Sequence, residues 1–327
     1  MSANLRCFWL VLLCMSCIYQ GHAFAQSYPT RSVQIIVPFP TGGATDVTSR
    51  ILAQGLTEHM GQSVVIINRP GGSATIGMNS VAKSTPDGYT LGVASLSFVA
   101  NPPFMVGKMP FDTEKDLVPV SLIATVPLVM VINPAVPAKS VKEFIALAKS
   151  KPGALNYSSV GIASSGHLAM ELFESLTSTK LTHIAYNTSP TPPVVAGEAQ
   201  ALISPVTANQ AFIKSGRLVA LGVTTAARVP TLPDVPTIAE AGVPGFEMFE
   251  WVGLVAPTGT PNAVINQLYQ EIVKTLAEPG VRRSIENAGG LVAGSTPAEL
   301  GAHIKKELAV WAKISAEIHA RDAATNP

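Results

Sequence analysis

The pattern that most constrains this chain is a short apolar run, then a loop of glycine and small hydroxyl residues, then a helical stripe. Residues 33–37 are mostly β-branched, the loop contains Gly42 and Gly43, and apolar residues recur at helical spacing from Val47 to Met60. This order predicts a strand, a tight loop and a helix. Thr45 has the side chain of an N-cap, so we expect the helix to begin there.

Such a loop can bind an anion. Because Gly42 and Gly43 have no Cβ, they permit positive φ and let a ligand come close to the backbone. The free N–H groups of the first helical turn, at the positive end of the helix dipole, would face that ligand. A plain α/β turn has the same sequence features, and both interpretations stay open at this point.

The same pattern recurs in the second half of the chain. A strand at 155–157 is followed by a serine- and glycine-rich loop at 158–166 and a helix at 167–177. The chain alternates strands and helices throughout, which predicts two α/β lobes with parallel sheets covered by helices on both faces. In such sheets, ligands bind outside the carboxyl ends of the strands. A long strand at 122–134 and a returning strand at 251–257 would be the two crossings of a hinge.

Residues 1–25 have the features of a secretory signal peptide. Arg6 is followed by an apolar segment from Cys7 to about Ile18, and Ala23-Phe24-Ala25 has the small-x-small pattern of a cleavage site. The mature chain should begin near Gln26 and, since all three cysteines precede it, should contain no thiol. Ser16-Cys17 resembles a lipoprotein site, but Cys14 stands where an aliphatic residue belongs, so a lipid anchor is the lesser alternative.

Charge and composition exclude several classes of function. Without Arg6, the 22 basic residues become 21, which equals the 21 acidic residues, so no basic field for nucleic acid or membrane phosphates is expected. The longest later apolar run, residues 118–132, is shorter than the ~20 residues of a membrane span. We therefore expect a soluble mature protein. The full chain is 47% apolar, and a mature chain of this kind can form one large core or two ordinary ones.

Common enzyme motifs are incomplete in this chain. Ser80 and Lys83 match S-x-x-K without its companion motifs, and residues 72–77 have the P-loop spacing but Met78 stands where the lysine belongs. The histidines have no partner at the spacing of metal ligands, so neither a metal nor a cofactor is expected. His167 lies at a helix start beside the serine loop, where it could serve at a cleft or could cap and pack the helix.

Six short motifs occur in an order that gives the chain a resemblance to a known family. They are Val-Pro-Phe-x-x-Gly-Gly-x-x-Asp (37–46), Asn-Arg-Pro-Gly (68–71), Pro-Asp-Gly-Tyr-Thr-Leu (86–91), Lys-Pro-Gly-x-Leu-Asn-Tyr (151–157), Leu-Pro-Asp-Val-Pro-Thr-Ile-Ala-Glu-Ala-Gly (232–242) and Ala-Pro-x-Gly-Thr-Pro (256–261). The chain resembles the Bug proteins, the periplasmic substrate-binding components of tripartite tricarboxylate transporters (TTT), over essentially its whole mature length.

The resemblance implies a two-lobed α/β fold of the Venus flytrap type that closes on a small organic acid in the periplasm. Lobe 1 would comprise residues 26–125 and 251–327, and lobe 2 residues 126–250. The implied ligand-binding residues of lobe 1 are Phe39, Thr41, Gly42, Gly43, Thr45, Asp46, Ser95, Ser97 and Asn101. Those of lobe 2 lie in the loop from Ser158 to His167 and beyond it, namely Ser158, Ser159, Gly161, Ala163, Ser164, His167, Tyr186 and Ser189.

Two departures from the family pattern concern the ligand. The family often has Asn-Gly where this chain has Ile162 and Ala163, and Asp where it has Ser204-Pro205. Both make the cleft less polar, which favours a more apolar or aromatic acid. Backbone N–H groups, hydroxyls and bridging waters can hold its carboxylate without an arginine. Asp46 could complement the helix dipole, or it could contact a ligand ammonium group or an ordered water.

The expected function is capture of a small carboxylate and delivery to the membrane subunits of a tripartite transporter. A ligand that touches both lobes would favour a closed state, which the membrane partner could distinguish. A sensing protein that docks on a sensor kinase needs the same cleft and stays an alternative. A third alternative is a secreted hydrolase that uses Ser164 or Ser165 with His167. The sequence shows no acidic residue that would orient the histidine, which argues against this alternative. We expect a monomer without a nucleic-acid partner.

Overall fold

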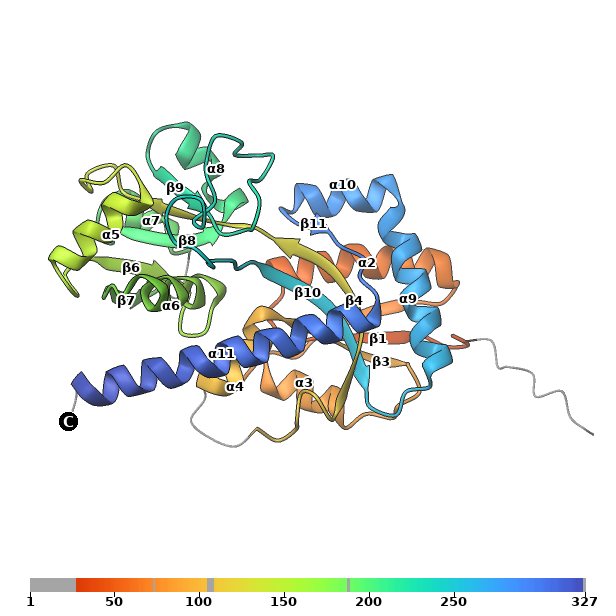
Figure 1. Ribbon diagram of the computed structural model, residues 1–327. Helices are drawn as coiled ribbons and strands as arrows, with labels where there is room; N and C mark the ends of the chain where they lie inside the picture. The colour runs from red at the N-terminus through yellow and green to blue at the C-terminus, as the bar shows by residue number, and fades with distance from the viewer. Residues whose placement is uncertain (1–27, 73, 105–108, 187–188, 326–327) are drawn as a thin grey trace, which may run out of the picture.

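The computed structural model describes residues 28–72, 74–104, 109–186 and 189–325, and for 101–104 and 317–325 it describes the backbone alone. Its strands form two sheets, which occupy the right and left halves of Figure 1. The predicted signal peptide, residues 1–25, lies outside the described residues. Among the helices that are described, none combines the length and the apolar character of a membrane span.

The first sheet has six strands in the order β11-β4-β10-β3-β1-β2. β1 runs parallel to β2 and β3, but β10 runs antiparallel to both β3 and β4. The expectation of a parallel sheet is therefore wrong for β10, because this strand enters from the second sheet and runs in the opposite direction. The strands are β1 (Val33–Val37), β2 (Val64–Asn68), β3 (Thr90–Ser95), β4 (Leu117–Val126), β10 (Glu250–Pro257) and β11 (Leu291–Val292).

Helices cover both faces of the first sheet. Ile35 and Val37 pack with Leu52 and Leu268 on one face, while Ile36 belongs to the cluster on the other, as the alternation of a strand requires. All three strand residues are buried, so the predicted two-sided cover is confirmed here. The first face carries α2 (Ala44–Met60), α9 (Asn262–Ala277) and α10 (Pro279–Asn287), and the second carries α3 (Thr75–Ala82), α4 (Leu96–Phe104) and α11 (Pro297–Thr325).

The second sheet has five strands in the order β7-β6-β8-β5-β9. β6 is parallel to β7 and β8, whereas β5 is antiparallel to β8 and β9, so this sheet is also mixed. Helices again lie on both faces, with α5 and α6 on one and α7 and α8 on the other. The elements are β5 (Leu128–Ile132), β6 (Asn156–Ser159), β7 (Thr182–Ala185), β8 (Ala201–Pro205), β9 (Val219–Val223), α5 (Val141–Ser150), α6 (Ser165–Thr177), α7 (Thr191–Ala196) and α8 (Val206–Lys214).

The long strand predicted at 122–134 is in fact two strands in different sheets. Pro127 separates β4 from β5, and because proline has no N–H it cannot continue a ladder of hydrogen bonds. This is one crossing between the lobes, and residues 224–249 form the other. We propose that lobe 1 comprises residues 26–125 and 251–327 and that lobe 2 comprises residues 126–250.

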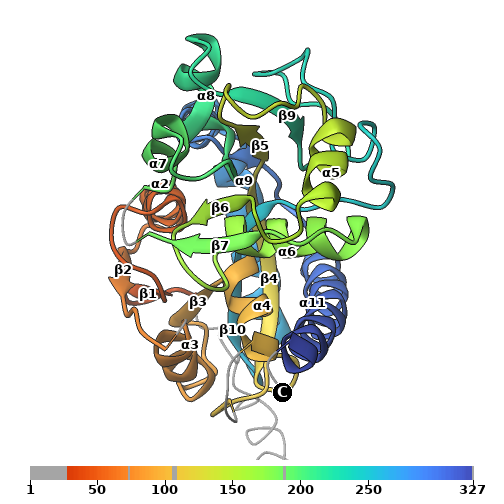
Figure 2. The ribbon, with the colours of Figure 1, turned by 90° about the vertical axis from the view of Figure 1, so that its left-hand side faces the viewer.

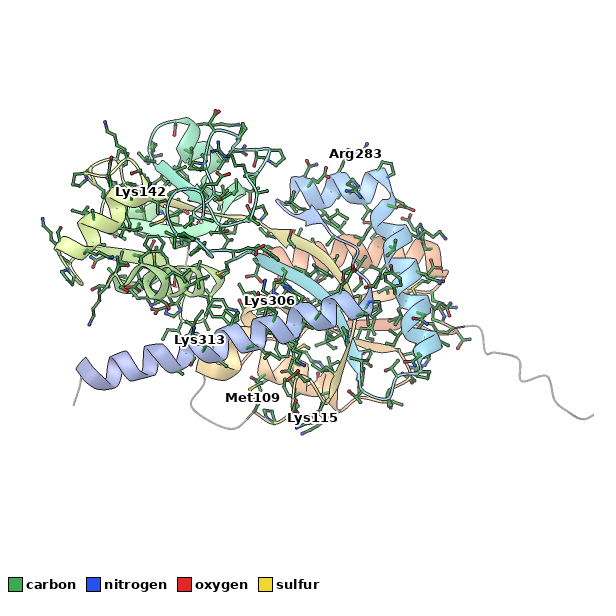
Figure 3. The ribbon with its side chains drawn as sticks, viewed as in Figure 1. Met109, Lys115, Lys142, Arg283, Lys306 and Lys313 are labelled. Carbon is green, nitrogen blue, oxygen red and sulfur yellow. The ribbon has the colours of Figure 1, made fainter. Side chains whose placement is uncertain are left out.

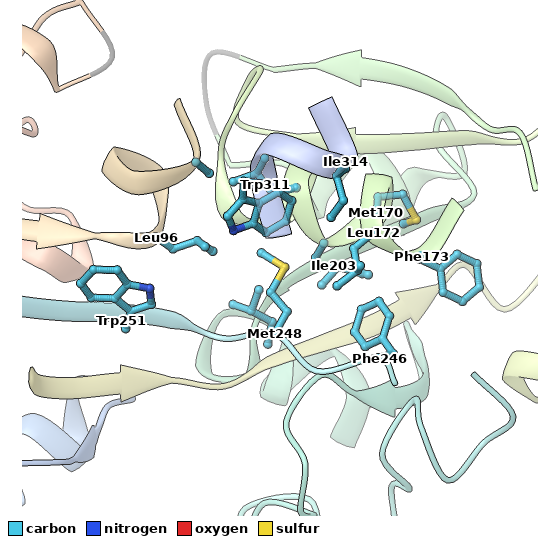
Figure 4. Close-up of a cluster of buried hydrophobic side chains, with 14 of the residues drawn as sticks. Leu96, Met170, Leu172, Phe173, Ile203, Phe246, Met248, Trp251, Trp311 and Ile314 are labelled. Atoms are coloured by element: carbon cyan, nitrogen blue, oxygen red, sulfur yellow. The ribbon is translucent and has the colours of Figure 1, made fainter. Parts of the chain in front are cut away.

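Helix α11 contacts both lobes as well. It lies beside α4 and also contacts α6, as Figures 1 and 2 show, and Lys306 and Lys313 mark its course in Figure 3. Its Trp311 and Ile314 belong to one hydrophobic cluster with Leu96 of α4 and Met170 of α6 (Figure 4). The two sheets are thus joined by two chain crossings and by an apolar contact through α11.

Candidate functional site

The first glycine loop joins β1 to α2, as predicted, but Thr45 is not the N-cap. The helix begins at Ala44, and the N-cap is Gly43, whose backbone is extended (φ −72°, ψ 164°) and whose carbonyl accepts the Val47 N–H at 2.9 Å. Gly42 has φ of 89°, a conformation that favours glycine. No side chain caps this helix end, so its first N–H groups are open to an external acceptor.

Asp46 holds this loop in place. Its side chain is 1% exposed, and it accepts hydrogen bonds from Gly42 N–H (2.9 Å), Arg50 Nε (3.0 Å) and Asn68 Nδ2 (2.8 Å). Burial alone would raise the pKa of this carboxyl, but the hydrogen bonds from Arg50, Gly42 and Asn68 together outweigh it, so the pKa lies below its ordinary value. Asp46 is therefore an ionised group that ties the loop to the end of β2.

The remaining predicted residues of lobe 1 lie at the carboxyl end of β3 or near the first loop. Ser95 ends β3 and is fully buried, and its Oγ has no hydrogen-bond partner among the described residues. Ser97 and Asn101 both lie on α4, four residues apart and so on one face, although the side chain of Asn101 is outside the described part. Phe39 is half-buried, and Thr41 is exposed.

Helix α4 follows directly on β3 and spans residues 96–104, a segment for which the sequence analysis predicted no helix. The small side chains of Ser95 and Ser97 have little helical signal of their own, and Pro102 follows closely. Burial of Leu96 and Phe98 against the first sheet stabilises the helix despite these residues.

In lobe 2, the serine loop is folded by its own hydroxyl groups. Ser159 Oγ accepts the Gly161 N–H at 3.0 Å, and Ser164 Oγ donates to the Gly161 carbonyl at 2.7 Å. Ser164 is also the N-cap of α6, since its Oγ accepts the His167 N–H at 3.4 Å. At the tip of this loop, the side chains of Val160 and Ile162 are 58% and 74% exposed. The predicted strand, loop and helix are confirmed in both lobes.

His167 lies behind the loop in a buried cluster. It is 7% exposed, its Nδ1 accepts the Ala163 N–H at 3.4 Å, and its ring centroid lies 4.5 Å from that of His183. Tyr157 stacks on His183 at 4.8 Å. Burial, and then the charge of His167, lower the pKa of His183 to about 4, so His183 is neutral at pH 7. The structure thus shows His167 packing and supporting the loop.

This geometry argues against a hydrolase in which Ser164 is the nucleophile and His167 is its general base. The Ser164 hydroxyl donates to the Gly161 carbonyl and accepts from the backbone N–H of His167, not from its ring. The imidazole Nδ1 faces the Ala163 N–H, and Nε2 lies 3.8 Å from Glu171 Oε1. A general base must lie within hydrogen-bond reach of the proton it takes.

A cavity of about 100 Å³ opens in lobe 2 where α6, α7 and β8 meet. Three predicted residues line it, namely Ser159, Ser164 and Ser189. Of its other lining residues, Val160, Ser165 and Gly166 lie within the predicted loop, and Ser204 and Pro205 are the predicted departure from the family pattern. The sequence analysis assigned no site role to the remaining ones, which are Pro190, Thr191, Ile203 and Ala208. Gly166 permits a close approach here, because a Cβ on it would lie 2.4 Å from the carbonyl oxygen of Ile203.

One buried side chain, Asn209 of α8, connects two walls of this cavity. Its Nδ2 donates to Ser204 Oγ at 2.7 Å, and its Oδ1 accepts from Thr191 Oγ1 at 3.2 Å. The signal that could have found these residues is a third strand-to-helix junction, β8 to α8, which the sequence analysis treated only as a departure from the family pattern.

Five predicted lobe-2 residues are not among those lining the cavity, namely Ser158, Gly161, Ala163, His167 and Tyr186. Ser158 is fully buried, and its Oγ donates to the Pro190 carbonyl at 2.7 Å, which ties β6 to the start of α7. Tyr186 is half-buried after β7, and its N–H bonds the Ser159 carbonyl at 2.9 Å. Their observed contacts hold the strand ends together.

Comparisons with known proteins agree with this architecture. The sequence profile of the tripartite tricarboxylate transporter family receptor, TctC, matches residues 48–319. The chain belongs to the TctC family. Protein BugT of Bordetella pertussis is 37% identical over 305 residues, which cover 91% of this chain and 92% of BugT. The resemblance to the Bug proteins and the two-lobed α/β fold are thereby confirmed, and the family consists of periplasmic solute-binding proteins.

Two solved structures contain carboxylates. The structure of R. palustris Rpa4515 with adipate is 35% identical, with a TM-score of 0.76 over 88% of this chain and 97% of that one. MatC from Rhodopseudomonas palustris with bound malate is 28% identical, with a TM-score of 0.75 over 88% of this chain and 100% of that one. These TctC-like proteins thus hold small dicarboxylates.

Proposed function

We propose that this protein captures a small organic carboxylate between its two lobes and delivers it to the membrane subunits of a tripartite transporter. The observation that carries the proposal is the uncapped start of α2 behind a glycine loop, which Asp46 fixes in position. Adipate and malate in similar proteins support a carboxylate as the ligand class.

In this proposal, lobe 1 binds the carboxylate. The N–H groups of the first turn of α2 and the exposed Thr41 hydroxyl are donors, and the positive end of the helix dipole favours the negative charge. Asp46 acts by positioning rather than by contact, because its carboxylate already accepts three hydrogen bonds and is buried. Thr41, Gly42, Gly43 and Thr45 thus remain the proposed contacts of this loop.

Lobe 2 would hold the rest of the ligand. The hydroxyls of Ser165 and Ser204 lie in the cavity wall among apolar groups such as Ile203 and Pro205. Val160 and Ile162 are exposed at the tip of the loop, where they could cover an apolar part of the ligand as the lobes close. This mixture fits an organic acid with a sizeable hydrocarbon part.

The test is calorimetry of the mature chain with mono-, di- and aromatic carboxylates, after a thermal-shift screen. A ligand at 100 times its Kd adds ~2.7 kcal/mol to the free energy of unfolding, which such a screen detects. In Gly43→Val, the new side chain would obstruct the ligand, and a Cβ there has only the Pro40 carbonyl oxygen nearby, at 3.8 Å. We expect at least a tenfold loss of affinity.

The matched control is Gly280→Val, where an added Cβ meets no atom within 4 Å and which should bind as the wild type does. If no carboxylate binds, or if Gly43→Val binds as tightly as Gly280→Val, the proposed site is wrong. Delivery is tested separately, by ligand uptake into vesicles that contain the membrane subunits, with and without the binding protein.

A further inference from the structure

Glu250 occupies an unusual position for an acidic residue. It is the first residue of β10, where the chain returns from the second sheet, and it pairs with Val126 at the end of β4. Two residues on, Val252 pairs with Ser95, the last residue of β3. Because side chains two apart on a strand share a face, Glu250 and Ser95 lie on the same face of the sheet, at its edge beside the hinge.

Both side chains keep a polar atom without a partner. Glu250 Oε1 and Ser95 Oγ are buried, and neither has a hydrogen-bond partner among the described residues. Buried polar atoms are normally hydrogen-bonded, so two such oxygens at neighbouring strand ends indicate a missing partner. Both oxygens can accept a hydrogen bond, but when Glu250 is ionised only the Ser95 hydroxyl can donate one.

Glu250 contacts groups from both lobes. The Ser165 hydroxyl, at the start of α6, and the backbone N–H groups of Leu96 and Trp251 lie close enough to its carboxyl to favour the charged form and so to lower its pKa. Ser165 also lines the cavity of lobe 2. Glu250 therefore lies at the hinge end of the proposed cleft, next to a group that faces the ligand.

The described residues place no cation in an ion pair with Glu250. Burial, opposed by the hydrogen bonds and supported by the negative charge of Glu307 on α11, raises its pKa to about 7. His303 of the same helix packs on Phe249 and Trp251, but burial and Lys306 lower its pKa, so it is neutral at pH 8.

We propose that Glu250 determines ligand specificity: with the Ser95 hydroxyl it forms a subsite for a hydrogen-bond donor at the hinge end of the cleft. The preferred ligand is then an organic acid whose second polar group is an ammonium or a hydroxyl. A second carboxylate at this point would face the Glu250 carboxylate and would bind only with uptake of a proton that the two share. This inference rests on the proposed function, since it assumes that the first carboxylate binds in the cleft.

The experiment is calorimetry at pH 8 with matched probes, namely succinate, 4-aminobutanoate and 4-hydroxybutanoate, and the corresponding six-carbon acids. We expect the wild type to bind the best amino or hydroxy acid at least tenfold more tightly than the diacid of the same length. Binding of a diacid should take up about one proton, which is measured from the dependence of the heat on the ionisation enthalpy of the buffer.

Glu250→Gln removes the charge and keeps the shape of the side chain. In this variant, the diacid should gain at least tenfold in affinity, the amino acid should lose at least tenfold, and proton uptake should disappear. Glu247→Gln, an exposed change three residues earlier, is the matched control and should alter none of these quantities. A purely structural role for Glu250 would change the melting temperature and leave the ligand preference as it is.

The inference is overturned if the wild type prefers diacids at pH 8 without proton uptake, or if Glu250→Gln keeps the wild-type preference. The wild-type measurements alone decide the first point, so the test does not depend on the variant folding. In both cases carboxylates still bind and the proposed function stands. If no acid binds either protein, the proposed function itself fails.

Discussion

Two carboxylates, the buried Asp46 and the half-buried Glu250, lie at the edge of the first sheet, and their surroundings differ in nearly every respect. Asp46 accepts three hydrogen bonds, one of them from Arg50, and its pKa is lowered. Among the described residues, Glu250 forms no ion pair and keeps a buried oxygen without a hydrogen-bond partner, and its pKa is raised. A carboxylate whose donors are all supplied by the protein positions a loop, whereas one left unsatisfied is suited to a ligand.

The largest loss of stability should come from removing the Asp46 carboxylate, whose hydrogen-bond donors are all supplied by the protein. Asp46→Ala leaves the buried Asn68 amide and the Gly42 N–H without their acceptor. We expect a loss of about 3 kcal/mol in the free energy of unfolding at pH 7, measured with urea. Asp234→Ala, at an exposed aspartate, is the control and should change it little. If both variants lost the same small amount of free energy of unfolding, Asp46 would not be the residue that holds the loop in place.

The same anchor predicts a pH dependence. Because the folded-state pKa of Asp46 is lowered, its contribution to stability is present above its unfolded pKa of about 4 and is lost as the pH falls through the folded value. In Asp46→Asn, this part of the acid destabilisation should be absent. Urea titrations between pH 2 and 6 measure it, and parallel curves for wild type and variant would contradict the assignment.

Ionisation of Glu250 should change the stability of the folded chain with pH in the opposite direction to Asp46. Its raised pKa means that the folded chain keeps the proton longer, so wild-type stability falls as the pH rises from the unfolded pKa toward about 7. Glu250→Gln should therefore be more stable than wild type at pH 8, by about 2 kcal/mol after a discount for partial exposure, and nearly equal to it at pH 4. A variant less stable than wild type at pH 8 would show that the ionised Glu250 holds the hinge together.

Changes in the serine loop of lobe 2 should cause a smaller loss of stability. Ser164 caps α6 through a hydrogen bond of 3.4 Å, so Ser164→Ala should cost ~1 kcal/mol, and Ser164→Asp, which can also cap, should restore most of it. Urea unfolding at pH 7 compares the two. If the aspartate variant were as unstable as the alanine variant, the role of Ser164 would lie in its bond to the Gly161 carbonyl instead.

The smallest effect is expected for Arg50. Its side chain is 47% exposed, so solvent screens the ion pair with Asp46, which should contribute little to stability despite the 3.0 Å distance. Arg50→Met should therefore be milder than Asn68→Ala, which removes a donor to the buried carboxylate. Comparison of their urea midpoints decides whether the buried amide or the surface charge maintains the loop.

Much of the fold was predictable, because apolar periodicity is local. Residues 33–60 and 155–177 contain their own strand and helix signals, and the structure confirms those elements within a few residues. The break at Pro127 was not predicted, because the residues on either side are equally apolar and only their pairing in different sheets separates them. Thr45 was a reasonable N-cap by residue type, but the extended backbone of Gly43 begins the helix earlier.

The site was predictable only where one segment defines it. The positions of Gly42 and Ser164 follow from a strand, a loop and a helix in succession. The partner of Asp46 lies 22 residues away in β2, and the surroundings of Glu250 are brought together from β3, α4 and α6. No local pattern marks such contacts, so neither the role of Asp46 as an anchor nor the position of Glu250 followed from the sequence.

The central claim is that a carboxylate binds between the lobes and favours their closed arrangement. Small-angle X-ray scattering of the mature chain, with and without a saturating carboxylate from the calorimetric screen, tests it most directly. We predict a smaller radius of gyration with the ligand, and no change for Gly43→Val at the same ligand concentration. A carboxylate that binds tightly while leaving the radius of gyration of the wild type unchanged would contradict the account.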